Sequence, residues 1–109
     1  MSDFPSDANG DALRRVASDS DMSRPMDIDF MVAVPDEEAG RAVAYAAQAR
    51  GFSTSVKQDQ ESGNWTCYCT KSMLATYDGV LEAQAELDRI AEPHRGYSDG
   101  WGTFGNSQS

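Results

Sequence analysis

The sequence predicts an α+β domain in which a four-stranded antiparallel sheet carries two helices on one of its faces. Three observations lead to this fold class. Residues 26–34 alternate apolar and polar side chains, as a strand with one wet face does. Residues 36–51 and 72–93 repeat apolar residues at helical spacing. Between these helical segments, two short strand patterns are joined by a turn that contains Gly63, which indicates a hairpin.

The chain opens with a short helical pattern in "GDALRRVASD", residues 10–19. Asp11 is predicted to cap this helix, and Leu13 and Val16 fall on one side of it. A polar stretch that ends in Pro25 separates the helix from the alternating strand. One face of that strand is apolar and holds Met26, Ile28, Phe30, Val32 and Val34. The other face holds Asp27, Asp29, Met31 and Ala33.

The next helix, in "PDEEAGRAVAYAAQARG", has signals at both ends. Asp36 is the predicted N-cap, and Glu37 and Glu38 suit the positive end of the helix dipole. Gly51 suits the C′ position, where the backbone becomes left-handed. The stripe that packs on the sheet is predicted to consist of small residues, namely Ala39, Ala42, Val43, Ala46 and Ala47.

The predicted hairpin joins "FSTSVKQ", residues 52–58, to "WTCYCTK", residues 65–71. The longest helical pattern then runs to Pro93. Gly79 is its weak point, because a glycine inside a helix costs roughly 1 kcal/mol relative to alanine. The helix is therefore expected either to kink at this glycine or to begin at Asp78.

The last segment, "RGYSDGWGTF", is predicted to be a fourth strand, because its aromatic residues argue against a free tail and its lack of lysine argues against a phosphate loop. Gly100 and Gly102 indicate a bulge or a close backbone approach. Trp101 is predicted to pack inward, and Asp99 is predicted to stay near the surface.

This order of elements is that of the ferredoxin-like βαββαβ fold, preceded by a short N-terminal helix. In this topology the first strand is central, and the last strand lies beside it in the antiparallel direction. We assign residues 11–104 to one domain and residues 1–10 and 105–109 to disordered tails. The sheet face away from the helices is predicted to display Asp27, Asp29, Met31, Ser53, Ser55, Lys57, Thr66, Tyr68 and Thr70.

Charge is the strongest feature of the composition. The chain has 18 Asp and Glu against 9 Lys and Arg, a net charge of −9. Nucleic-acid backbones are bound by Lys and Arg clusters, and the sequence has one basic pair, so direct binding to nucleic acid or to an anionic membrane is not expected. From the given residues we expect neither a transmembrane segment nor a signal peptide, and the two cysteines suit a reducing compartment. We therefore expect a cytoplasmic protein whose charge suits a basic protein partner.

Few residues suggest catalytic or metal chemistry. Cys67 and Cys69 project from one face of a strand, and with His94 they supply one ligand too few for zinc. The first interpretation is therefore a pair of buried thiols, with a thiol or metal site as the alternative. His94 follows the last helix, where a positive charge is favourable, and no motif supplies it with a nucleophile or an acid. We expect neither enzyme activity nor a cofactor.

Seven residues are candidates for contact with a partner. Asp27 and Asp29 share one strand face, with a solvated surface as the alternative interpretation. Tyr68 lies with Met31 on the otherwise polar sheet face, and an aromatic there could stack an RNA base, but that function needs several aromatics and basic neighbours, which this face lacks. A protein contact is therefore the better hypothesis. The candidate residues are Asp27, Asp29, Met31, Tyr68, Tyr97, Asp99 and Trp101.

Three segments resemble the regulator of ribonuclease activity B family, the ribonuclease E inhibitors of the RraB type. They are "GDALRRVASDSDMSRPMDIDFMVAVPDEEAGRAVAYAAQARGF", "WTCYCTKSM" and "ELDRIAEPHRGYSDGWGTF", of which the Y-x-DGWG motif at residues 97–102 is the most specific. The resemblance covers roughly residues 10–104. It implies a ferredoxin-like α+β domain that is not an enzyme. It also implies binding to ribonuclease E, a lowered RNA cleavage and effects on the degradosome.

The best-known members of that family also carry a long acidic C-terminal tail, whereas residues 105–109, "GNSQS", contain no acid. If such a tail contributes to nuclease binding, residues 105–109 would not supply that contribution. The expected function is that of a non-enzymatic regulator that binds and inhibits a ribonuclease of the ribonuclease E type. The alternatives are a small-molecule-binding ferredoxin-like domain and a thiol or metal site at Cys67 and Cys69.

Overall fold

The computed structural model describes residues 7–106. Its elements, in chain order, are α1 (Ala8–Asp19), β1 (Met26–Val34), α2 (Glu37–Gln48), β2 (Ser53–Gln58), β3 (Trp65–Met73), α3 (Tyr77–Ala91), the 3-10 turn η1 (Glu92–His94) and β4 (Tyr97–Thr103). Within the described residues, no helix is both long enough and apolar enough to cross a membrane.

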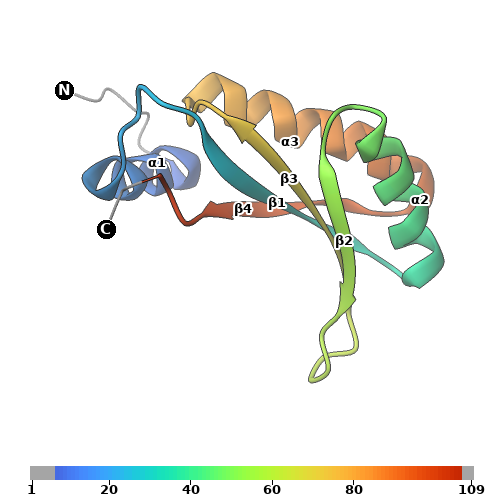
Figure 1. Ribbon diagram of the computed structural model, residues 1–109. Coiled ribbons are helices and arrows are strands. Elements are labelled where there is room, and N and C mark those ends of the chain that lie inside the picture. Colours follow the sequence, from blue (N-terminus) through green and yellow to red (C-terminus); the bar gives the residue numbers. More distant parts are fainter. Residues whose placement is uncertain (1–6, 107–109) are drawn as a thin grey trace.

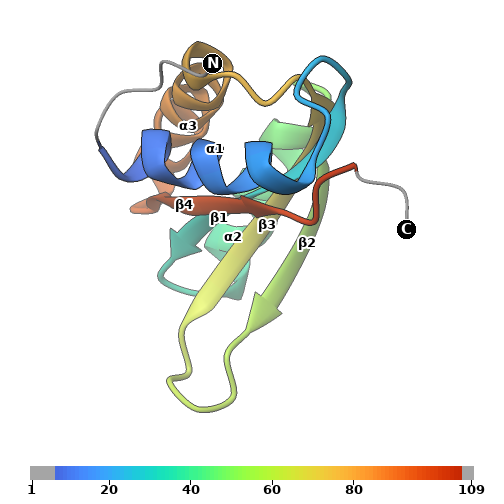
Figure 2. The same cartoon turned by 90° about the vertical axis from the view of Figure 1, so that its left-hand side faces the viewer.

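The four strands form one antiparallel sheet in the order β2-β3-β1-β4. Helices α2 and α3 cover one face of this sheet, and α1 lies on the same side, beside the end of β4 (Figure 1). The view turned by 90° agrees, and it shows the β2–β3 hairpin projecting beyond the rest of the fold (Figure 2). The structure confirms the predicted ferredoxin-like architecture, with the first strand central and the last strand beside it.

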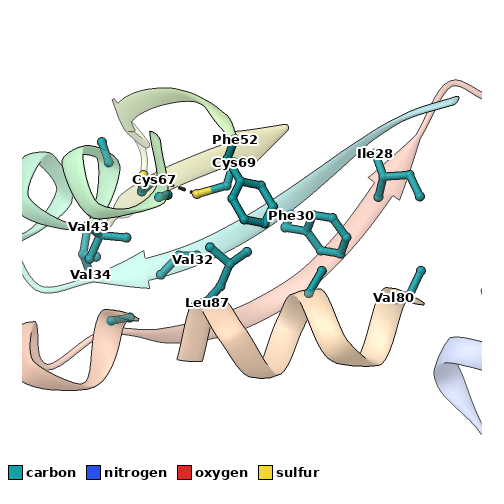
Figure 3. Close-up of a cluster of buried hydrophobic side chains, with 14 of the residues drawn as sticks. Ile28, Phe30, Val32, Val34, Val43, Phe52, Cys67, Cys69, Val80 and Leu87 are labelled. Atoms are coloured by element: carbon teal, nitrogen blue, oxygen red, sulfur yellow. Dashed lines mark hydrogen bonds between the residues drawn. The ribbon is translucent and has the colours of Figure 1, made fainter. Parts of the chain in front are cut away.

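The core lies between the sheet and its helices (Figure 3). The five alternating apolar residues of β1 are all buried, as predicted. Phe30 is at the centre, where its ring meets Phe52 edge to face with 6.2 Å between the ring centroids. The largest fully buried side chains are Phe30, Leu13, Ile28, Leu87, Val32, Val43, Val80, Cys67 and Cys69.

Both predicted ends of α2 are confirmed. The Asp36 side chain accepts a hydrogen bond from the N–H of Ala39 at 2.8 Å. At the other end Gly51 has φ +94°, and the N–H of Phe52 reaches back to the carbonyl of Ala47. The buried stripe differs from the predicted one, since it consists of Ala39, Gly40, Val43, Ala44 and Ala47. Gly40 belongs to it because a Cβ there would stand 2.8 Å from a Val56 methyl group, so the helix approaches the sheet too closely for a side chain.

The other two helices begin at residues that sequence reasoning placed differently. Helix α1 is capped by Asp7, whose side chain accepts from the N–H of Gly10, and not by Asp11. Helix α3 begins at Tyr77, because β3 continues to Met73 along the full length of β1. Gly79 is therefore in the first turn of α3, where its N–H donates to the hydroxyl of the N-cap Thr76. The helix has no glycine in its interior, which removes the predicted weak point.

The structure describes only part of the two segments that were predicted to be disordered tails. Residues 1–6 and 107–109 lie outside the described residues. Ala8–Gly10 form the first turn of α1. Near the other end, the Asn106 side-chain amide donates to the carbonyls of Asp21, Arg24 and Pro25. The segment after β4 is thus hydrogen-bonded to the loop that leads into β1.

Helix α3 is followed by a tight turn into β4. The N–H of Gly96 bonds to the carbonyl of Ala91, and the left-handed residue of this turn is Arg95, with φ +63°. Glycine occupies the next position because a Cβ on Gly96 would stand 2.7 Å from the carbonyl oxygen of Ala33. Gly96 is thus a glycine because of its close contact with β1, and the left-handed residue is Arg95, one position earlier.

The predicted bulge is present in β4. Ser98 pairs with Val32 and Trp101 pairs with Phe30, so the two residues between them, Asp99 and Gly100, stand opposite Met31 alone. Gly100 supplies the left-handed conformation that the bulge needs, with φ +100°. Because of the extra residue, the side chains of Ser98 and Trp101 both turn toward the helices, and those of Tyr97 and Asp99 turn away from them.

Candidate partner-binding face

The face of the sheet that carries no helix is called the open face below. The strand pairing places its side chains in rows that cross the sheet. One row runs from Tyr97 through Ala33 and Thr66 to Lys57, and the next contains Met31, Tyr68 and Ser55. A third runs from Gly102 through Asp29 and Thr70 to Ser53. All nine residues predicted for this face lie on it.

Six of the seven candidate contact residues lie on the open face, namely Asp27, Asp29, Met31, Tyr68, Tyr97 and Asp99. The most exposed aromatic among them is Tyr97, of which 58% is accessible, and Tyr68 is 36% accessible. Asp27 and Asp99 are exposed, while Asp29 and Met31 are half-buried. Aromatic and apolar side chains and carboxylates therefore share one surface.

Trp101 lies on the other side of the sheet and does not belong to the open face. Its ring packs against the core, as predicted, and its Nε1–H donates to Asn9 Oδ1 of α1 at 2.8 Å. A hollow of about 290 Å³ lies beside the ring, between α1 and the end of β4. The sequence gives no signal for Asn9 as a partner, because the two residues are 92 positions apart.

Carboxylates outnumber cations on the open face. The strands place Asp27, Asp29, Asp99 and Lys57 on it, and Arg95, just before β4, lies at its edge beside Tyr97 and Asp99. The Thr70 hydroxyl donates to Asp29 Oδ1 at 2.5 Å, which fixes the direction of that carboxylate. The Lys57 ammonium is 5.9 Å from the centre of the Tyr68 ring. These side chains line a shallow hollow of about 420 Å³ over β1, β2 and β3. Sequence reasoning placed Lys57 and Thr70 on this face but did not join them to Asp29, because that requires the strand register.

Strand β4 contributes almost no side chains to the middle of the open face. Its residues next to Met31 and Asp29 are Gly100 and Gly102. The bulge requires a glycine at position 100. Position 102 has no such requirement, because its φ is not positive and no neighbouring atom lies within 4 Å of the place where a Cβ would stand. From the sequence, both glycines were interpreted as indications of a bulge. It could not be predicted that Gly102 leaves the neighbouring β1 side chains without cover.

A second hollow, of about 400 Å³, lies at the end of β1, where the β2–β3 hairpin extends past the rest of the sheet (Figure 2). It is lined by Arg95, Tyr97 and Asp99, together with the hairpin residue Asp59. The Asp59 carboxylate accepts hydrogen bonds within the turn from the N–H of Glu61 and the hydroxyl of Ser62, and these lower the pKa of Asp59. Asp59 thus stays charged through the neutral range.

The two cysteines lie under α2, on the side of β3 opposite the open face. Both are free and fully buried, and their Sγ atoms are 3.8 Å apart (Figure 3). Contact with Cys67 and burial in the core raise the pKa of the Cys69 thiol. His94 is in η1. Among residues 7–106, no three His, Cys, Asp or Glu side chains gather closely enough to hold a metal ion.

The chain matches the model of a known protein family. The family model described as Regulator of ribonuclease activity B matches residues 6–103. That range includes every helix and strand of the structure and ends at the last residue of β4. The comparison with curated proteins finds no match.

Proposed function

The chain belongs to the regulator of ribonuclease activity B family, and we propose that it is a non-enzymatic cytosolic protein that binds a ribonuclease of the ribonuclease E type and lowers its cleavage of RNA. The observation that carries the proposal is the open face. It brings Tyr68, Tyr97 and Met31 together with exposed carboxylates on a rigid sheet. Rigid aromatic side chains supply contact area at little entropic cost, which suits a protein interface.

Charge supports a contact with the nuclease rather than with its RNA. The chain has a net charge of −9. The strands present three carboxylates and one lysine on the open face, and Arg95 and Asp59 border it, so acidic groups outnumber cations where a base-stacking sheet needs cations for the RNA phosphates. A nuclease that binds RNA presents basic surface of its own, and this surface attracts an acidic domain. The acidic domain then competes with RNA for that surface, and cleavage falls.

The proposal is tested with the full chain and a purified ribonuclease E-type enzyme. We expect complex formation in a pull-down without RNA, slower cleavage of a fluorescent single-stranded RNA, and weaker binding as salt rises, because the Debye length falls from about 10 Å at 0.1 M to about 3 Å at 1 M. An enzyme that neither binds the chain at low salt nor slows in its presence contradicts the proposal. The RNA alone serves as the control, and it should not bind the chain.

A further inference from the structure

The middle of the open face has a step in its surface. Tyr68 and Thr70 of β3 stand beside Met31 and Asp29 of β1. On the other side of these β1 residues, strand β4 presents only the backbone of Gly100 and Gly102. Both β1 side chains are therefore only half-buried. We call this area, formed by Asp29, Met31, Gly100 and Gly102, the bare strip.

The fold does not account for the bare strip at position 102. Glycine weakens a strand because it has no side chain to pack and loses the most freedom on folding. At Gly40 and Gly96 a Cβ would collide with another part of the chain, at 2.8 and 2.7 Å respectively. At Gly102 the space is open and φ is not positive. Position 102 could hold a larger side chain, yet it is a glycine. The space above it is therefore free for a side chain of another molecule.

The chemistry around the bare strip indicates what would fit there. Its floor includes the thioether of Met31, whose methyl group is 3.8 Å from where a Cβ of Gly100 would be. Tyr68 forms its wall. An aromatic or large aliphatic side chain would find apolar contact on both. Carboxylates stand on either side, with Asp27 and Asp29 toward the start of β1 and Asp99 toward its end. The apolar floor thus has anionic flanks.

We propose that the bare strip accepts a basic peptide segment of the partner, in which one aromatic or large aliphatic side chain lies between arginine or lysine residues. The apolar side chain lies over the β4 glycines against Met31, with Tyr68 on the far side of Met31. The flanking cations meet Asp29 with Asp27 on one side and Asp99 on the other. The identification of the partner as a nuclease rests on the proposed function, whereas the chemistry of the segment rests on the surface itself.

Three synthetic pentapeptides test the proposal by NMR titration of the full chain at low salt. The first has phenylalanine between two pairs of arginines. The second has the same phenylalanine between pairs of glutamates, and the third has glycine between the arginine pairs. We expect the first to bind at least tenfold more tightly than either of the others, and to shift the Met31 methyl and Tyr68 ring signals. Shifts confined to other residues, or equal binding of the glutamate peptide, overturn the proposal.

Two kinds of variant, each with a matched control, locate the site. Gly102→Val adds a side chain to the bare strip where a Cβ meets no atom within 4 Å, so the protein should fold with an equal or higher melting temperature and bind the first peptide at least tenfold more weakly. Ser53→Val adds the same kind of side chain in the same row, at the far edge of the sheet about 14 Å away, and should leave binding unchanged. Asp27→Asn with Asp29→Asn removes two surface charge pairs and should weaken binding about tenfold, which corresponds to about 1.4 kcal/mol. The control Glu38→Gln with Glu82→Gln makes the same change in net charge on α2 and α3 and should have little effect.

The outcomes separate this proposal from the proposed function. If Gly102→Val binds the peptide and inhibits the nuclease as wild type does, the bare strip is not the docking site, although the proposed function stands. If wild type binds the peptide at the bare strip but does not bind the nuclease, the proposed function fails and the assigned chemistry remains. Two further results overturn the docking proposal. One is binding of a single-stranded RNA to the open face, and the other is a dimer that Gly102→Val dissociates in sedimentation.

Discussion

Adjacent residues of β1 lie in opposite surroundings on the two faces of the sheet. Phe30 is fully buried and meets Phe52 beneath the helices. Its neighbours Asp29 and Met31 lie on the open face, half-buried, with β4 glycines on one side. The same backbone therefore supports a packed core on one side and an uncovered surface on the other. On the helix side the β1 side chains pack against other side chains of the core. On the open face a substituted side chain would be in contact with solvent.

The glycines show the same difference. Gly40 and Gly96 are on close approaches between elements, where a Cβ would overlap another residue. Gly102, on the open face, has free space around it. Glycine thus has a structural role at the two packed positions, and at position 102 its absence of a side chain exposes Asp29 and Met31. Changes on the helix side should alter stability, and changes on the open face should alter binding.

The largest expected effect is that of removing the central core side chain. Phe30→Ala should lower the free energy of unfolding by about 3–5 kcal/mol, because the ring is fully buried and leaves a cavity. Met31→Ala, one residue away on the open face, should cost less than about 1 kcal/mol, because the side chain is half-exposed. Urea unfolding followed by circular dichroism measures both values. If both variants lost a similar free energy of unfolding, the open face would be as closely packed in solution as the core. The proposed difference between the two faces would then be wrong.

Trp101 should give the next largest effect, because it lies on the helix side but is only partly buried. Trp101→Ala should cost about 2–3 kcal/mol, below the 3–5 kcal/mol of a fully buried aromatic residue. Trp101→Phe retains most of the packing and removes the hydrogen bond to Asn9, so it should cost about 1 kcal/mol. Neither variant should bind the arginine peptide more weakly while it is folded. A folded Trp101→Phe protein that no longer binds the peptide would place the indole in the contact surface.

Much of the fold could be predicted because its signals are local. The alternation of residues 26–34 gave β1 with its bounds, and Asp36 and Gly51 gave the ends of α2. The start of α1 was wrong, because Asp7 and Asp11 are equally good caps and only packing against α3 separates them. Of the two expectations for α3, a start at Asp78 was one residue from the observed start at Tyr77. The kink at Gly79 was wrong, because β3 continues along β1 to Met73, and strand pairing is not local information.

The candidate site was predictable only as a list of residues. Alternation along β1 placed Asp27, Asp29 and Met31 on one face, and the six residues that the structure brings together were all on the list. Their arrangement was not predictable, because it depends on which residues of β3 and β4 stand opposite β1. The bulge is decisive, since its extra residue turns Trp101 to the core and leaves two glycines beside the open face. The Asp29–Thr70 bond likewise requires the register.

Two glycine-to-alanine variants test the difference between the packed side and the open face with the addition of a single methyl group. Gly96→Ala places a methyl group against the backbone of Ala33, which cannot move without disturbing β1, so it should cost about 1–3 kcal/mol. Gly102→Ala meets open space and should be neutral or stabilise by about 0.5–1 kcal/mol, because alanine loses less freedom on folding. Thermal unfolding of the two proteins under the same conditions measures the difference. A loss of stability in Gly102→Ala comparable to that of Gly96→Ala would show that the bare strip has a structural role.

The smallest expected effect concerns the link between α1 and α3 on the helix side, where the Tyr77 hydroxyl donates to the Asp7 carboxylate. This bond and the N–H of Gly10 lower the pKa of Asp7, and the bond to Asp7 raises the pKa of Tyr77. The stabilisation that comes from Asp7 is complete above the unfolded pKa near 3.9, and it is lost as pH falls through the lower folded pKa. The stabilisation that comes from Tyr77 is complete below about pH 10, and it is lost as pH rises through the raised folded pKa.

The difference in unfolding free energy between wild type and Tyr77→Phe should therefore be largest between about pH 4 and pH 10 and should shrink outside that window. Tyr45→Phe is the matched control, because Tyr45 is exposed on α2 and its variant should show no such window. Urea unfolding across the pH range measures both differences. A difference that stays constant with pH would mean that Tyr77 stabilises α1 by packing alone. The helix side would then depend on contact between side chains even at its edge, and the contrast with the charged open face would become sharper.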